Sequence, residues 1–186
     1  MKKLFNNPAI KFVIVFLLLF LIFYYFNIYY FAATSPTSRY YQSFLAHNLN
    51  YIKWLRLLLL DMSTGILNLL GFTTIHDDYI MLVAGHGSIQ VVYKCLGLGV
   101  ISFFVAFVVA YPKPVKSKAI FIVTGIIVLQ ILNMIRFMLL AVFWTKTDST
   151  LIDHHSIFNF IIYLIVAVSL YFWVKEPVNK KKHASN

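Results

Sequence analysis

The sequence predicts an all-α polytopic integral membrane protein with about four transmembrane helices, an interfacial or re-entrant helix and a short outer β-hairpin before Cys95. Three features of the composition predict this class. Hydrophobic residues make up 61% of the 186 residues, and only 12% are charged, against about 25% in soluble domains. The 16 Lys and Arg residues exceed the 6 Asp and Glu residues and give a net charge of +10. So little polar sequence cannot build a solvated nucleic-acid groove, whereas basic loops beside membrane spans explain the excess.

Four apolar runs are long enough to cross a bilayer, which takes about 20 mostly apolar residues. The first covers 12–33 and is interrupted by Asn27. We interpret it as a retained anchor, because it is long for a signal-peptide core and ends in a poor cleavage site. The other three predicted spans cover 95–111, 119–144 and 157–174.

Residues 34–94 are the least hydrophobic part of the chain. The stretch 48–72 is helical in pattern but carries Lys53, Arg56 and Asp61, so we expect an interfacial or re-entrant helix. Two β-rich runs then flank the turn sequence Gly-His-Gly at 85–87 and predict a hairpin that leads into the second span.

The distribution of charge predicts the orientation. Basic residues dominate 1–11, 112–118 and 175–186, whereas the loops 34–94 and 145–155 together carry five bases and five acids. By the positive-inside rule, both termini and the 112–118 loop face the cytoplasm. The predicted units are a cytoplasmic end with the first anchor (1–33), an extracytoplasmic or interfacial segment with the hairpin (34–94), a catalytic three-helix membrane core (95–174) and a basic cytoplasmic tail (175–186).

The single cysteine, Cys95, lies where the hairpin meets the second span, at the predicted outer edge of the membrane. One cysteine excludes an internal disulfide framework and a multi-cysteine metal site. Lys94 and a helix N-terminus beside the thiol would favour the thiolate, which is the nucleophilic form. The alternative is that Cys95 is a small hydrophobic residue of the core.

Arg136 is the only charged residue in the predicted third span. An ionisable residue inside a membrane span is costly and indicates a function. Gln130, Asn133 and Arg136 recur every three residues, so they share one broad helical face. This pattern indicates a polar face inside the protein; the alternative is an arginine that snorkels from a helix that ends earlier.

His154 and His155 begin the last span at the outer edge, level with Cys95. Histidine is the usual proton carrier near neutral pH, although interfacial polar residues that cap a helix are an alternative interpretation. A thiol nucleophile, a histidine and a cationic oxyanion stabiliser make a complete acyl-transfer set. They come from three spans, and spacing alone leaves their convergence open.

These motifs resemble those of the exosortase/archaeosortase family of membrane cysteine transpeptidase-like enzymes. The family pattern is Cys-x-Gly at the outer end of a span, Asn-x-x-Arg in a following helix and a His that begins a later one. The match covers about 79–173, and the chain looks most like the compact exosortases of Bacteroidetes-type bacteria. The matching positions are Cys95, Gly97, Asn133, Arg136 and His155.

The chain departs from the family pattern at two positions. Leu96 follows the cysteine, where many members have a small residue, and Asn159 stands four residues after His155, where members often have glycine. These departures bear on which sub-family the chain resembles and on how its substrate fits the site, more than on the three catalytic positions.

The resemblance implies an exosortase-like membrane cysteine protease or transpeptidase of the bacterial cytoplasmic membrane, without cofactor or metal. It would cleave the C-terminal sorting signal of exported proteins, a short motif with a transmembrane helix and a basic tail, at the extracytoplasmic face. Cys95 would attack the peptide carbonyl, Arg136 would stabilise the oxyanion and His155 would transfer protons. Water, a lipid or a glycan would accept the new C-terminus. The supporting or alternative residues are Gly97, Asn133, His154 and Asn159.

Two other functions stay open from the residues alone. One is a metal-dependent membrane hydrolase, although no metal-binding spacing such as His-Glu-x-x-His occurs. The other is a non-enzymatic membrane subunit or small channel, in which Asn133 and Arg136 would line a polar path. The candidate metal ligands at the predicted outer side are His76, Asp77, Asp78, His86, His154 and His155.

Overall fold

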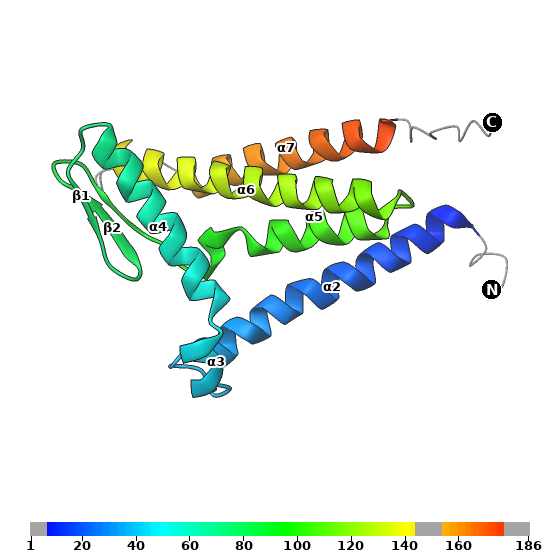
Figure 1. The fold of residues 1–186 in the computed structure, drawn as a ribbon, viewed down its shortest axis with the longest axis horizontal. Helices are drawn as coiled ribbons and strands as arrows, with labels where there is room; N and C mark the ends of the chain where they lie inside the picture. Colours follow the sequence, from blue (N-terminus) through cyan, green and yellow to red (C-terminus); the bar gives the residue numbers. More distant parts are fainter. Residues whose placement is uncertain (1–6, 144–153, 177–186) are drawn as a thin grey trace, which may run out of the picture.

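The computed structural model describes residues 7–143 and 154–176, with 154–157 described by their backbone alone. Within these residues, four helices are long and apolar enough to cross a membrane. They lie alongside one another, and a small sheet lies beyond one end of them (Figure 1). The predicted class, an all-α polytopic membrane protein, is confirmed.

The membrane helices begin and end close to the predicted spans. Asn7 caps the first of them, since its side chain accepts a hydrogen bond from Ala9 N at 3.0 Å, and a proline follows in the first turn, where it is tolerated. Pro112 and Pro114 lie in the short turn between the second and third helices, since proline cannot continue a helix interior. The four helices are α2 (Pro8–Thr34), α5 (Leu98–Ala110), α6 (Val115–Phe143) and α7 (His154–Lys175). The span that contains α5 begins at Tyr93, in the helical turn before it.

Aromatic side chains pack α2 along α5. Residues four apart lie on one face of a helix, and α2 carries phenylalanines at this interval. The Phe16 ring lies 5.3 Å from the Phe103 ring and 5.8 Å from the Phe107 ring, both in edge-on contacts. Phe12 makes a similar contact with Phe107 at 5.3 Å. These contacts make α2 and α5 the most closely associated pair of membrane helices.

Asn27, which interrupts the apolar run of the first span, joins three helices. Its Nδ2 donates to Phe23 O at 2.8 Å and to Ser102 Oγ of α5 at 3.2 Å. The hydroxyl of Tyr51 donates to Asn27 Oδ1 at 2.5 Å, and burial raises the pKa of Tyr51 to about 12. Because polar groups without partners are costly inside a membrane, this network explains how the first span accommodates an asparagine.

The predicted interfacial or re-entrant stretch forms α4 (Tyr51–Leu69), after the short helix α3 (Ser43–Asn48). It is absent from the described helices that are long and apolar enough to cross a membrane. Its buried face carries Arg56, which is 4% exposed. Arg56 Nε donates to Asp78 O at 2.7 Å, and the guanidinium lies 3.8 Å from the centre of the Tyr79 ring. The helix is therefore packed against the sheet by a buried cation.

The predicted hairpin is present, together with one further strand. Strands β2 (Ile80–Val83) and β3 (Ser88–Gln90) are antiparallel, with Met81 opposite Ile89. Strand β1 (Thr74–His76) pairs with the other edge of β2, so the described chain contains a three-stranded sheet in the order β1-β2-β3. The sequence did not indicate β1, because three residues are too few to show an alternating pattern.

The turn of this hairpin holds the end of α6. Gly87 N donates to Ala141 O at 3.1 Å, and His86 Nδ1 donates to Val142 O at 3.0 Å. The last carbonyls of a helix have no partner within the helix, and the turn supplies two donors for them. It thereby fixes the half of α6 that carries the predicted site residues.

Two lysines bond helix ends at the opposite side of the molecule. Lys113 Nζ donates to Trp173 O and, at 3.1 Å, to Glu176 O, and it lies 4.6 Å from the centre of the Trp173 ring. Lys118 Nζ donates to Val109 O at 2.7 Å. A cation is favourable at a helix C-terminus, so these lysines stabilise the ends of α7 and α5.

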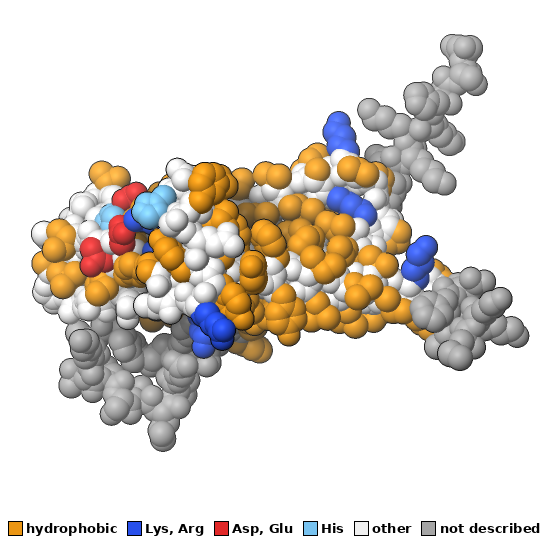
Figure 2. Space-filling view, turned by 90° about the horizontal axis from the view of Figure 1, so that it is seen from below, with side chains coloured by type: hydrophobic (Ala, Val, Ile, Leu, Met, Phe, Trp, Pro, Cys, Tyr) orange, Lys and Arg blue, Asp and Glu red, His pale blue; other side chains and the backbone are white. Residues whose placement is uncertain are grey.

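The surface shows the polarity expected of a membrane protein. Hydrophobic side chains cover the middle of the face in Figure 2. Lys and Arg side chains lie at the end away from the sheet and also in the half near the sheet, whereas Asp and His side chains gather only over the sheet on this face. The apolar band between them is where a bilayer would contact the helices.

Candidate active site

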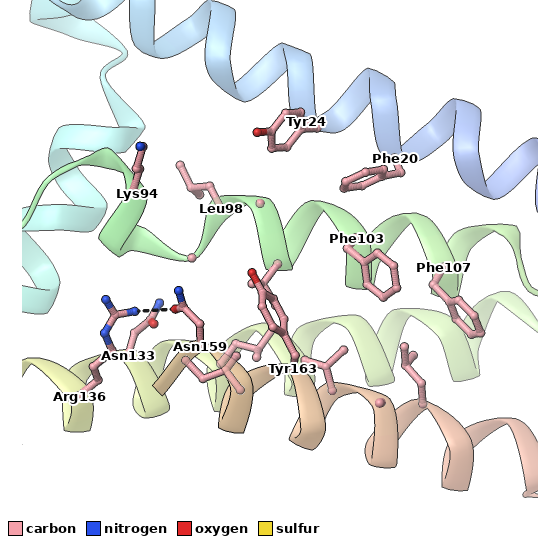
Figure 3. A pocket seen from close by; sticks show the side chains of 18 of the residues that line it. Phe20, Tyr24, Lys94, Leu98, Phe103, Phe107, Asn133, Arg136, Asn159 and Tyr163 are labelled. Atoms are coloured by element: carbon pink, nitrogen blue, oxygen red, sulfur yellow. Dashed lines mark hydrogen bonds between the residues drawn. The ribbon is translucent and has the colours of Figure 1, made fainter. Parts of the chain in front are cut away.

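A pocket of about 970 Å³ lies between α2, α5, α6 and α7. One end is polar, and the rest is lined mainly by aromatic and aliphatic side chains (Figure 3). The polar end contains Lys94, Gly97, Asn133, Arg136 and Asn159, so it contains four of the predicted site residues.

Cys95 lies in η1 (Tyr93–Leu96), a short 3-10 turn that joins the sheet to α5. Gly97 ends this turn with φ +69°, in the left-handed region that favours glycine. Cys95 is half-buried, and its side chain packs against the hydrophobic cluster formed by α4, the sheet and α6. Among the described residues of this stretch, Tyr93, Lys94 and Gly97 line the pocket, and Cys95 does not.

The Cys95 turn is packed directly on the polar face of α6. A Cβ atom at position 97 would lie 2.6 Å from Asn133 Nδ2, so the turn and the helix are in contact. Asn133 Nδ2 donates to Gln130 Oε1 at 3.4 Å, and Gln130 Nε2 donates to Leu96 O at 3.4 Å. Gln130 and Asn133 therefore hold the backbone that follows Cys95.

We expect Gly97→Ala to displace the Cys95 turn from α6. At a positive φ, alanine adds backbone strain of about 1–2 kcal/mol. Because the added methyl group also meets Asn133, the free energy of unfolding should fall by about 1–3 kcal/mol more than the strain alone explains. The measurement is thermal unfolding in detergent. Gly85→Ala is a matched control, because Gly85 has φ +75° but no atom within 4 Å of an added Cβ. Equal losses in the two variants would contradict the contact with Asn133.

Arg136 lies at the centre of the polar end and is 3% exposed. Its Nη1 donates to Asn159 Oδ1 of α7 at 3.1 Å. Asn133, on the preceding turn of α6, is buried to the same extent. The structure thus brings Gly97, Asn133, Arg136 and Asn159 together from three helices.

His154 and His155 are the first residues of α7, and their side chains lie outside the described part of the structure. The backbone of α7 places His155 one turn before Asn159, so the two positions share a helix face. Tyr163, one turn further along, lines the pocket. The position of His155 on the helix is therefore level with the polar end.

The described residues considered for a metal site make other contacts. His76 Nε2 lies 2.8 Å from Asp61 Oδ1, and Lys53 Nζ lies 2.8 Å from Asp78 Oδ2. Asp77 accepts two backbone N–H hydrogen bonds, which lower the pKa of its carboxyl group below the usual value. In residues 7–143 and 158–176, whose side chains the structure describes, no group of three or more His, Cys, Asp or Glu is arranged to hold a metal ion; the side chains of His154 and His155 lie outside these ranges.

The sequence did not indicate how α2 contributes to the pocket. Phe20 and Tyr24 of α2 line it, and the four-residue interval of the aromatic residues was the available signal. Lys94 was considered only as a neighbour of the thiol, but it lines the polar end. Gln130 was recognised as part of a polar face, whereas its bond to the Leu96 carbonyl depends on the tertiary structure.

Comparison with known protein families finds a family model that matches most of the chain. A family model described as Transmembrane exosortase (Exosortase_EpsH) matches residues 4–173, which include every predicted site residue. No curated protein and no solved structure matches the chain. The matched residues form most of the sequence, and the chain therefore belongs to the transmembrane exosortase family.

Proposed function

We propose that this protein is a membrane cysteine protease or transpeptidase that removes the C-terminal sorting signal of exported proteins. Membership of the exosortase family supports the class of function. The observation that carries the proposal is the contact between the Cys95 turn and the polar face of α6. There Gly97 lies against Asn133, three residues before the buried Arg136.

In the proposed reaction, Cys95 Sγ attacks the carbonyl carbon of the peptide bond to be cleaved, and His155 accepts the thiol proton. The carbonyl oxygen becomes an oxyanion, which the Arg136 guanidinium stabilises. When the tetrahedral intermediate collapses, the C–N bond breaks and His155 gives its proton to the leaving amine. The exported protein is then attached to Cys95 as a thioester.

A second nucleophile releases the product. Attack by water gives a new C-terminal carboxylate, and attack by a hydroxyl or amino group of a lipid or glycan gives an ester or an amide. In either case His155 accepts a proton from the nucleophile and returns it to the Cys95 thiolate as the C–S bond breaks. The first outcome is peptidase activity and the second is transpeptidase activity.

The surrounding polar residues hold the catalytic groups in position and do not contact the reacting atoms. Asn159 orients Arg136 through the 3.1 Å hydrogen bond to Nη1. Gln130 and Asn133 hold the backbone on the C-terminal side of Cys95. A donor that is already fixed and shielded from water stabilises a developing charge more strongly than a mobile, hydrated one.

The proposal includes an orientation and a substrate class. Both termini would lie in the cytoplasm and the polar end of the pocket would face outward, in the cytoplasmic membrane of a bacterium. The excess of basic over acidic residues at the end of the molecule away from the sheet supports this orientation. The substrates would carry a short motif, a transmembrane helix and a basic tail at their C-terminus.

The test is a processing assay with the purified chain in liposomes. The probe is an exported reporter protein fused to a C-terminal signal of this kind from the same genome. We expect the reporter to be shortened, and N-ethylmaleimide to block this, because the chain contains 1 cysteine. Shortening that survives complete alkylation, or that EDTA abolishes, would reject the thiol mechanism. A reporter that stays intact would favour a non-enzymatic subunit.

A further inference from the structure

The pocket extends from its polar end as an apolar groove, here called the α2–α7 groove. Helices α2 and α7 form its walls, and α5 forms its floor. Among the described residues that line it, the charged ones are Lys94 and Arg136, both basic. Figure 3 shows the aromatic side chains that reach into it, which include Phe20, Tyr24, Phe103, Phe107 and Tyr163.

The α7 wall combines residues that pack inside the protein with residues that face the groove. Ile162, Val166 and Leu170 are buried in a cluster with side chains of α5 and α6. Tyr163, Ala167 and Tyr171, at intervals of four residues, are exposed.

The lining residues of α7 recur at intervals of three and four from Asn159 to Val174, which is the spacing of one continuous helical stripe. Val174 comes 15 residues after Asn159, so the stripe is about 22 Å long at 1.5 Å per residue. The small Ala167 lies within it, between Tyr163 and Tyr171, and small residues allow close approach of helices in membranes.

The groove opens sideways. Tyr163 and Tyr171 are 56% and 60% exposed, although both line the groove. At the end far from the polar residues, α2 and α7 are joined through Tyr111, whose ring lies 5.7 Å from both the Phe12 and the Trp173 rings. The opening between α2 and α7 therefore faces the region that lipid would fill.

The length of the groove decides between two apolar occupants. The hydrocarbon core of a bilayer is about 30 Å thick, so one leaflet offers about 15 Å. A lipid held by its headgroup at the polar end would leave the far third of a groove of about 22 Å unfilled. A helix that crosses the membrane lies along the whole stripe, and helix-in-groove packing uses residues at these intervals.

We propose that the α2–α7 groove is the docking site for one apolar, membrane-spanning helix of the substrate, which enters sideways between α2 and α7. This inference rests on the proposed function. The docked helix lies on the exposed residues of the α7 stripe, which are Tyr163, Ala167 and Tyr171, and on the aromatic side chains of α2 and α5. The chain that leaves its outer end passes Lys94 and Arg136 and reaches the Cys95 turn.

The test fills the groove without touching its polar end. Ala167→Trp adds an indole to an exposed position on the stripe. Val168→Trp adds the same group at the next residue, which is exposed but outside the groove. With the reporter that carries the C-terminal signal in liposomes, we expect Ala167→Trp to slow cleavage at least about tenfold, which corresponds to a loss of ~1.4 kcal/mol in the free energy of docking. Val168→Trp should cleave at the wild-type rate. Equal rates in the two variants would overturn the proposal.

Photocrosslinking separates this proposal from the proposed reaction. A benzophenone amino acid at position 167 should crosslink to the reporter's apolar helix, and the same group at 168 should not. That result would support docking even if the wild-type chain did not cleave the reporter, which would reject the proposed function alone. Normal cleavage by Ala167→Trp with loss of co-purified phospholipid would identify a lipid site and reject docking of the helix.

Discussion

Replacing Cys95 with alanine abolishes cleavage of the tailed reporter while the chain still inserts into the membrane. The proposed reaction has no nucleophile without the thiol, and the loss of a covalent nucleophile lowers turnover by about 10⁴-fold or more. Cys95 is half-buried against the cluster of α4 and α6, and alanine retains a small apolar group there. The measurement is the fraction of reporter shortened over time, with membrane insertion checked by protease protection of the tail.

Cys95→Ser provides the sharper comparison. Serine has nearly the shape of cysteine, but its hydroxyl is a much weaker nucleophile near neutral pH without a base adapted to it. We expect thermal stability in detergent close to that of the wild-type chain together with loss of cleavage. If the alanine and serine variants both cleave normally, the thiol mechanism is wrong.

Replacing Arg136 with lysine has the second-largest expected effect. Lysine keeps the charge but loses the planar guanidinium that bonds Asn159 while presenting further donors. Loss of one oxyanion donor commonly lowers kcat by about 10²–10³-fold, and we expect a decrease of this size with little change in KM. The measurement is the initial rate of reporter cleavage at several reporter concentrations.

Arg56→Lys is the matched control for this substitution. Arg56 is buried to a similar extent, at 4% exposed, but it bonds the Asp78 carbonyl between α4 and the sheet. The Arg56→Lys substitution should lower the thermal stability and leave kcat almost unchanged after correction for the fraction of protein that is folded. A similar loss of kcat in both variants would assign Arg136 a structural role.

The sequence predicted the membrane helices well because length and hydrophobicity are local properties. A run of about 20 apolar residues has few alternatives to a spanning helix. The same local reasoning distinguished 48–72 from the spans, since three charged residues lower its hydrophobicity. The hairpin was recognised because its turn carries two glycines between β-rich runs.

The arrangement of the candidate site depends on tertiary contacts. The spacing of Asn133 and Arg136 predicted a shared face, but it did not show that Gly97 lies directly against that face. The side of the turn on which Cys95 lies, toward the hydrophobic cluster rather than the pocket lining, follows from the backbone of η1 and Gly97. The role of Asn159 as the partner of Arg136 depends on the register of α7 against α6, which no single-helix pattern encodes.

The two lysines that bond helix ends have a consequence for the evolution of the sequence. In the proposed orientation, Lys113 and Lys118 contribute to the charge bias that insertion machinery reads, and in the folded protein they bond carbonyls at the ends of α7 and α5. Moving a lysine elsewhere in the loop preserves the first role and loses the second. Selection therefore acts on these positions twice, once during biogenesis and once in the finished fold, so they should drift more slowly than lysine positions that only the insertion machinery reads.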